Sequence, residues 1–212
     1  MESKKRPLPD DILLRADAQR NRERLLAAAE NVFLERGAET SMEDVAKRAG
    51  VGIGTLYRRF PTRESLLAAA YSARFLALAA DSQARFNTLE PLAALRAYLH
   101  ELVVQTSVYR GLAASLGAML QSGTPGCEAT SKEGRRLLLH AQKSGAVRAD
   151  VTFDDLIVVA TATSLATEQA GSPKARIAHL LGLFLDGIGS RARTSHVAIL
   201  AAGRESEVSR LR

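Results

Sequence analysis

The sequence predicts an all-α protein with a three-helix N-terminal domain and a larger helical C-terminal domain. Alanine and leucine dominate the 212 residues, and β-branched residues rarely cluster as they do in strands. Apolar residues recur with helical spacing, and no stretch shows the sustained alternation of a half-buried strand. Glycine and proline divide the chain into runs of helical length. A chain of this length has room for one or two domains and a substantial core.

The first 16 residues are predicted to form a flexible basic arm. Lys4, Lys5 and Arg6 precede a short segment interrupted by Pro7 and Pro9. We expect such a segment to be disordered in the free protein. It is also typical of an arm that settles on phosphates or in a minor groove once DNA is bound. The two interpretations are compatible.

A helix-turn-helix is predicted over residues 40–66. Thr40 or Ser41 can cap its first helix, because either hydroxyl can accept a backbone N–H bond. Two acidic residues follow in the first turn, where negative charge suits the helix dipole. Gly50 ends this helix, because glycine adopts a left-handed conformation without a steric penalty. Two short helices joined at a glycine turn are the form in which many proteins contact the major groove.

The second short helix exposes a polar side and ends at Pro61. Leu56 and Phe60 lie four residues apart and share its buried side. A hydroxyl, an aromatic ring and two guanidinium groups are left on the remaining surface: Thr55, Tyr57, Arg58 and Arg59. Such a helix is suited to a polar, anionic partner. The alternative is a purely structural helical hairpin, since a glycine turn between two helices also occurs without any ligand.

The remaining chain divides into further helices and a tail. We place the DNA-binding domain at 17–62, a regulatory domain at 63–193 and a C-terminal tail at 194–212. Thr62 caps a new helix, which is predicted to run without a break over Arg63–Phe86 and to link the two domains. Later helices are predicted over Glu90–Tyr109, Gly111–Gln121, Glu128–Lys143, Phe153–Ala170 and Lys174–Arg191.

The last two long helices are too apolar to be buried by one chain alone. The first is apolar nearly all round from Leu156 to Ala160, and the second carries large apolar side chains on most of its surface. The economical solution is a four-helix bundle formed with the same helices of a second copy. The predicted interface residues are Leu156, Val159, Leu180, Phe184 and Ile188. The alternative is a central helix buried within a monomer.

The N-terminal segment resembles the TetR/AcrR family of bacterial transcriptional regulators. The resemblance covers roughly residues 17–66 without a gap. It rests on the A-G-V turn and the T-L-Y-x-x-F-P-x-R-E-x-L run, with Val45, Ala46, Ala49, Gly50, Val51, Thr55, Leu56, Tyr57, Phe60, Arg63, Glu64 and Leu66 at matching positions. The chain departs from the family pattern at Gly52 and Ile53, where the family often has serine and a polar residue. The operator sequence therefore cannot be transferred from relatives.

The resemblance implies a homodimeric repressor that leaves a pseudo-palindromic operator when a small molecule binds. We expect Ile53, Thr55 and Arg58 to contact base edges, with Ile53 against a thymine methyl group. Phosphate contacts are expected from Thr40, Ser41, Tyr57, Arg59 and Arg63. The expected partners are a double-stranded DNA operator, a second copy of the chain and a small-molecule effector.

The effector pocket is expected among the helices of residues 75–170. Candidate lining residues are Phe75, Phe86, Tyr98, Leu102, Tyr109, Met119, Leu137 and Thr163. Each of these is also an ordinary helical core residue. Glu168 and His140 are candidates for orienting a ligand, or they simply meet water. These residue types leave the chemistry of the ligand open.

Several other classes of function are disfavoured. No histidine has a metal-binding spacing, the Gly50–Gly54 run lacks the strand and lysine of a nucleotide loop, and no catalytic constellation appears. We therefore expect no enzyme, metal or cofactor. A net charge of +6 favours a polyanionic partner. The single cysteine, Cys127, excludes an intrachain disulfide and suits a reducing cytoplasm, where a chromosome-associated protein without a membrane span is expected.

Two rival functions remain. One is a DNA-binding dimer that needs no ligand, or that acts as an activator. The other is an all-α small-molecule-binding protein whose helix-turn-helix has lost its affinity for DNA. The intact Tyr57-Arg58-Arg59 surface argues against the second.

Overall fold

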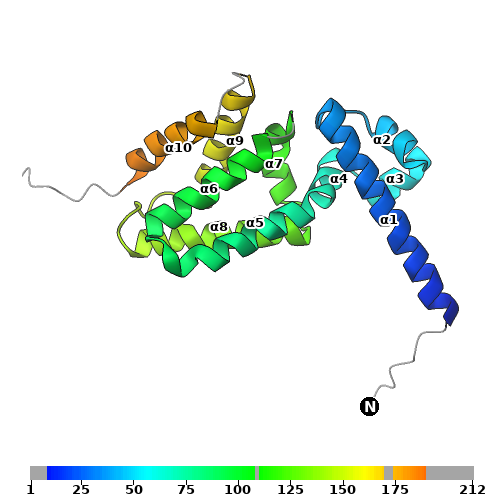
Figure 1. The fold of residues 1–212 in the computed structure, drawn as a ribbon, viewed down its shortest axis with the longest axis horizontal. Helices are drawn as coiled ribbons and strands as arrows, with labels where there is room; N and C mark the ends of the chain where they lie inside the picture. Colours follow the sequence, from blue (N-terminus) through cyan, green and yellow to red (C-terminus); the bar gives the residue numbers. More distant parts are fainter. Residues whose placement is uncertain (1–8, 108–109, 170–173, 190–212) are drawn as a thin grey trace, which may run out of the picture.

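The computed structural model describes residues 9–107, 110–169 and 174–189, and within them it is helical, as the sequence predicts (Figure 1). One lobe holds α1 to α4, and the other holds α5 to α10. The helices are α1 (Pro9–Arg36), α2 (Met42–Ala49), α3 (Ile53–Arg59), α4 (Arg63–Ala70), α5 (Ser72–Arg85), α6 (Pro91–Ser107), α7 (Leu112–Leu120), α8 (Pro125–Lys143), α9 (Phe153–Gln169) and α10 (Lys174–Ile188), with a 3-10 turn at Phe86–Thr88.

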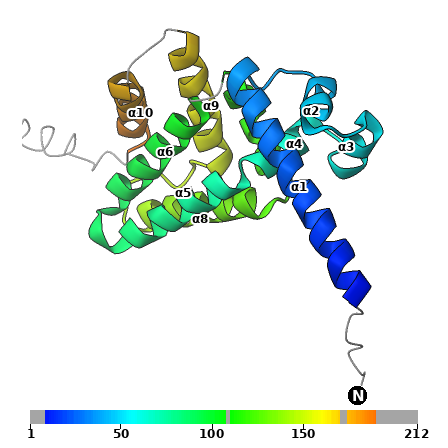
Figure 2. The ribbon, with the colours of Figure 1, turned by 45° about the vertical axis from the view of Figure 1, so that its right-hand side comes forward.

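Helix α1 has a buried C-terminal half and a projecting N-terminal half. Leu25, Ala29, Val32 and Phe33 share one side and are at most 2% exposed. Residues 17–24 are all exposed, and this half of the helix extends away from the body in both views (Figures 1 and 2). Because α1 begins at Pro9, it starts within the segment that the sequence assigned to the arm. Arm residues 1–8 and the tail from residue 190 lie outside the described residues.

The turn between α2 and α3 forms by the chemistry expected of its residues. Ser41 is the N-cap of α2, and its hydroxyl accepts the backbone N–H of Asp44 at 3.1 Å. Thr40 instead donates its hydroxyl to the Gly37 carbonyl at 2.8 Å. Gly50 ends α2 in the left-handed region, with φ of 67°. Helix α3 begins after Gly52 with no side-chain cap, because the family's serine is missing there.

The helix predicted over residues 63–86 is broken at Tyr71 into α4 and α5. Tyr71 has φ of −92° and ψ of 1°, and its side chain is buried. After this break, the backbone of Ser72 on α5 lies so close to Gly126 on α8 that an added Cβ would be 2.2 Å from the Ser72 oxygen. The Gly126 N–H also donates to the Ser72 hydroxyl at 3.0 Å. The sequence of residues 63–86 gives no sign of the bend, since this segment contains no glycine or proline. The bend permits the close contact of α5 with α8.

The C-terminal lobe encloses a buried carboxylate between α5 and α8. The Glu133 side chain is 0% exposed and accepts hydrogen bonds from Ser82 at 2.7 Å and from Arg136 at 2.7 and 2.8 Å. The Arg136 guanidinium lies 3.7 Å from the centre of the Phe86 ring. This network ties the two helices together and satisfies the charge that would otherwise be costly to bury.

Among the described helices, none combines the length and the apolar character that a membrane crossing requires.

Candidate DNA-binding surface

Helix α3 buries two large side chains and exposes most of the others. Leu56 is 0% and Phe60 is 6% exposed, as the four-residue spacing predicts. Ile53 and Tyr57 are 37% and 43% exposed. Such exposure is consistent with an interface that the isolated chain leaves uncovered.

The three residues predicted to contact bases lie on the same short helix. Ile53 is exposed at the first position of α3, and Thr55 is half-buried one half-turn later. The Arg58 guanidinium donates to the Thr55 hydroxyl at 2.9 Å. Arg58 is thus held along the helix by Thr55. The assignment of these three residues to bases stays a prediction.

The five residues predicted to contact phosphates differ in how free they are. Tyr57 and Arg59 are exposed. Arg63 donates to the Glu39 carboxylate at 2.9 Å, and the hydroxyls of Thr40 and Ser41 already serve the turn before α2 and its cap. Within the described residues, Tyr57 and Arg59 are therefore the more available of the five, and all five roles stay predictions.

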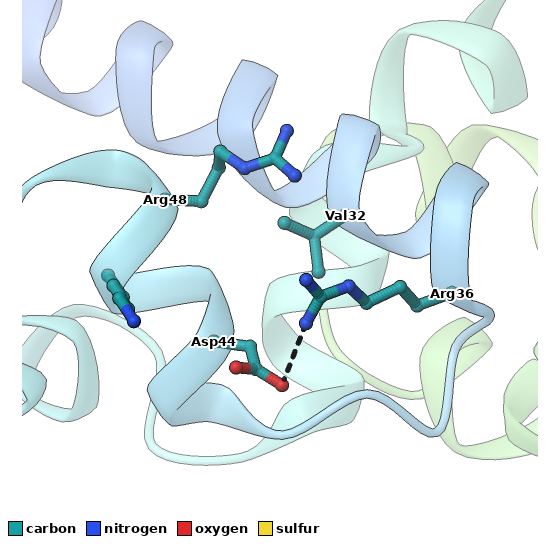
Figure 3. Close-up of a pocket in the computed structure, with 5 residues that line it drawn as sticks. Val32, Arg36, Asp44 and Arg48 are labelled. Atoms are coloured by element: carbon teal, nitrogen blue, oxygen red, sulfur yellow. Dashed lines mark ion pairs between the residues drawn. The ribbon is translucent and has the colours of Figure 1, made fainter.

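A hollow of about 340 Å³ between α1 and α2 is lined by Arg36, Lys47 and Arg48, and the two arginines are paired with carboxylates (Figure 3). Arg36 and Asp44 form an ion pair at 3.3 Å across it. Arg48, on the other side of the hollow, forms two hydrogen bonds with the Glu35 carboxylate, at 2.7 and 3.1 Å. These pairs join α1 to α2 and neutralise the two arginines of the hollow.

A second hollow, of about 260 Å³, lies between α1 and the turn leading into α3. Asn21 and Arg24 of α1 line it together with Thr55 and Arg59 of α3. Of these four, the sequence analysis assigned DNA contacts to Thr55 and Arg59 only. Arg24 was visible as part of a basic run on the first helix, but only the fold brings it beside α3.

The residues predicted to line an effector pocket belong to the core of the C-terminal lobe. Phe75, Tyr98, Leu102, Met119 and Leu137 are at most 2% exposed, Thr163 is buried, and Phe86 is partly buried. Tyr109 lies outside the described residues. The structure therefore places the described members in one domain, where they pack as core side chains.

Two polar candidates for ligand orientation occupy different settings. The Glu168 Oε1 atom accepts the backbone N–H of Gly111 at 2.8 Å. Its Oε2 atom is buried without a hydrogen-bond partner among the described residues. His140 packs against the Phe86 ring, with 4.8 Å between ring centres. Glu168 thus retains one unused acceptor, whereas His140 is engaged in an aromatic contact.

The predicted dimer residues fall into two groups on α9 and α10. Val159, Leu180 and Phe184 are half-buried on the surface. Leu156 and Ile188 are 0% and 8% exposed, so they support the two helices from within the chain's own core. The apolar side chains that protrude are Val158 and Leu183, at 66% and 60% exposure, and the sequence did not select them.

Neither a metal site nor a reactive thiol is seen in the part of the chain that the structure describes. No three histidine, cysteine or acidic side chains there come close enough to hold a metal ion. Cys127 is fully buried, and burial raises the pKa of its thiol, which disfavours the reactive thiolate.

Comparison with known proteins identifies the family. A model described as bacterial regulatory proteins of the TetR family matches residues 25–70, and one described as the SbtR-like C-terminal domain of transcriptional regulators matches residues 90–190. The chain is 33% identical to the TetR transcriptional regulator SCO0520 from Streptomyces coelicolor, over 81% of this chain and 99% of that one, with a TM-score of 0.50. The chain belongs to the TetR family. It is a DNA-binding transcriptional regulator, and the family is not one of enzymes.

Other similar proteins have a lower sequence identity or match a shorter segment. An HTH-type transcriptional regulator of Staphylococcus aureus (strain USA300) is 44% identical over 54 residues, which are 25% of this chain and 29% of that protein. The fold is also that of RolR in complex with resorcinol, at 24% identity, 84% and 91% coverage of this chain and that one, and a TM-score of 0.59. Thermus thermophilus FadR in complex with lauroyl-CoA has the same fold, at 23% identity, 82% and 98% coverage, and a TM-score of 0.56.

Proposed function

We propose that the chain is a homodimeric repressor that leaves a pseudo-palindromic operator when a small molecule binds its C-terminal domain. Each subunit would present α3 to one major groove, with the two grooves a helical turn apart or a multiple of it. Two features carry the proposal: an uncovered apolar surface on α9 and α10, and a hydrogen-bonded joint between the two domains.

The apolar surface supports the dimer. Val158 on α9 and Leu183 on α10 protrude into solvent, flanked by the half-buried Val159, Leu180 and Phe184. The two helices pack beside one another in the C-terminal lobe, with α10 on the side of α9 that faces away from α3 (Figures 1 and 2). A second copy packed there would cover this surface and leave both copies of α3 free for DNA.

The interdomain joint supports gating by a ligand. The Arg110 carbonyl, between α6 and α7, accepts the backbone N–H of Ala38, between α1 and α2, at 2.8 Å. The next residue, Gly111, donates its N–H to Glu168 on α9 at 2.8 Å. A ligand that displaces α9 would therefore move the loop that precedes α2 and α3. Its effect on DNA affinity cannot exceed its own preference between the two arrangements.

The relatives support an effector of small-molecule type. RolR was crystallised with resorcinol, and Thermus thermophilus FadR, described as a transcriptional repressor, with lauroyl-CoA. These two ligands differ greatly in size and polarity, so they support the class of mechanism and leave the chemistry of this effector open.

The dimer is tested by replacing Leu183 with glutamate and measuring mass in solution. A charge in the centre of the apolar surface should dissociate the dimer and weaken operator binding, because the two α3 helices then bind independently. Leu139→Glu on α8 is the matched control, since Leu139 is 51% exposed outside this surface. Equal behaviour of the two variants, or a monomeric wild type, would contradict the dimer.

The mode of regulation is tested in a reporter strain that carries the chain's own upstream DNA. A repressor predicts higher expression when the gene is deleted, and lower expression would mean an activator. If an effector releases the protein from DNA, substrates of the enzymes that the neighbouring genes encode should weaken DNA binding in vitro. A protein that binds DNA equally well with every compound tried would favour a ligand-independent regulator.

A further inference from the structure

The hollow between α1 and α3 concentrates positive charge that nothing in the described chain neutralises. Arg24 and Arg59 both line it, and no carboxylate pairs with either among the described residues. Most arginines nearby are paired: Arg36 with Asp44, Arg48 with Glu35, and Arg63 with Glu39. Two like charges beside one hollow favour the binding of an anion there.

The lining also supplies neutral hydrogen-bond donors of the kind that hold a phosphate. Asn21 contributes an amide from α1, and Thr55 contributes a hydroxyl from α3. Asn21 and Arg24 are three residues apart on α1, and Thr55 and Arg59 are four apart on α3, so each pair shares one side of its helix. The four side chains therefore approach the hollow from two helices.

The position of the hollow fits a duplex bound at α3. Thr55 lines it and also accepts the hydrogen bond from Arg58, so the hollow adjoins the side of α3 predicted to contact bases. A groove that admits α3 is bordered by the sugar-phosphate backbone, which must pass along the flanks of the helix. On the flank toward α1, that backbone meets this hollow.

We propose that this hollow is a seat for one backbone phosphate of the bound DNA. Arg24 and Arg59 supply the charge, and the Asn21 amide supplies a further donor. The seat rests on the DNA-binding function and extends it, because it makes α1 part of the interface. Arg24 then fixes the register of α3 in the groove without selecting a sequence.

The test compares Arg24→Gln with Arg22→Gln. Arg22 is also exposed and without a carboxylate partner in the described chain, but two residues along α1 it points about 200° away from Arg24. Both variants lose one charge per subunit. Affinity is measured by fluorescence anisotropy at several salt concentrations, on a duplex from the chain's own upstream region and on a random-sequence duplex.

The seat predicts that Arg24→Gln weakens binding to both duplexes equally and lowers the salt slope by about 0.9 per subunit. At 0.1 M salt this corresponds to an affinity loss of about eightfold per contact, relative to 1 M. Arg22→Gln should leave the slope nearly unchanged. Arg24→Gln combined with Arg59→Gln should lose less than the product of the two single losses, since both arginines bind one phosphate.

Equal losses for Arg22→Gln and Arg24→Gln would overturn the seat, because they would reflect net charge alone. An unchanged slope for Arg24→Gln would overturn it as well. The proposed repressor function fails separately, if the wild type does not distinguish the upstream duplex from the random one. In that case, a difference between Arg24→Gln and Arg22→Gln on the random duplex would still support the seat.

Discussion

Replacing Gly37 with alanine perturbs the interdomain joint at its tightest point. Gly37 has φ of 91°, where residues with a Cβ are rare. A Cβ there would lie 2.9 Å from the Arg110 carbonyl oxygen. That oxygen accepts the N–H of Ala38, which is fully buried. Relief of the clash therefore requires the Arg110 carbonyl to move and the hydrogen bond to weaken.

The cost has two parts, and a control separates them. The left-handed backbone costs about 1–2 kcal/mol for a residue with a Cβ, and a weakened bond to a buried N–H costs about 1–3 kcal/mol more. Gly50→Ala meets only the first cost, because Gly50 has φ of 67° but no atom within 4 Å of an added Cβ. The joint therefore predicts that Gly37→Ala is about 1–3 kcal/mol less stable than Gly50→Ala.

Urea unfolding of the two variants measures this difference directly. Operator affinity then shows whether the joint also positions α3: Gly37→Ala should change the affinity after its loss of stability is taken into account. Equal free energies of unfolding for Gly37→Ala and Gly50→Ala would refute the argument, since the contact with Arg110 would then contribute nothing.

Three further predictions concern other parts of the chain. Gly126→Ala should lower the free energy of unfolding by about 3 kcal/mol or more, or prevent folding, because the added Cβ would clash with the Ser72 backbone and force α8 and α5 apart. Gly117→Ala is the control, since its added Cβ meets open space, and it should raise the free energy of unfolding by about 0.5–1 kcal/mol. Thermal unfolding measures both variants. Burial raises the pKa of Glu133, but the hydrogen bonds it accepts outweigh burial and leave the pKa below its usual value. The stability that ionised Glu133 contributes is thus present above about pH 4.3 and is lost as the pH falls through the lowered pKa. Glu133→Gln should flatten the acid dependence of the free energy of unfolding, measured by urea titrations at several pH values. An acid dependence equal to that of the wild type would contradict this role of Glu133. Arg58→Ala should cost about 1–3 kcal/mol of operator affinity and relax selectivity at one base pair, whereas a uniform loss with a shallower salt slope would assign Arg58 to a phosphate.

Local chemistry made much of the fold predictable. Gly50 ends α2 and Thr62 caps α4, as predicted. Both features could be predicted because they depend only on neighbouring residues. The break at Tyr71 was not predictable in this way. The break permits a close contact between Ser72 and Gly126, which lies on α8 more than fifty residues further along the chain. The residues around Tyr71 are themselves all compatible with a continuous helix.

In the candidate DNA-binding surface, too, local features could be predicted and tertiary contacts could not. The buried and exposed sides of α3 follow from the spacing of Leu56 and Phe60. Whether an arginine is paired with a carboxylate does not follow from local spacing. Arg63 is paired with a carboxylate 24 positions away, and Arg24 comes to lie beside residues of α3 only through tertiary packing. On α9, apolar character alone could not distinguish the buried Leu156 from the protruding Val158.

Sequence-specific binding of DNA by α3 is tested most directly by one measurement. Fluorescence anisotropy of the wild-type protein compares a duplex from its own upstream region with a shuffled duplex between about 50 and 200 mM salt. We predict tighter binding to the upstream duplex at every salt concentration, with affinity for both duplexes falling steeply as salt rises. Equal affinity for the two duplexes, or no binding at low salt, would contradict the claim.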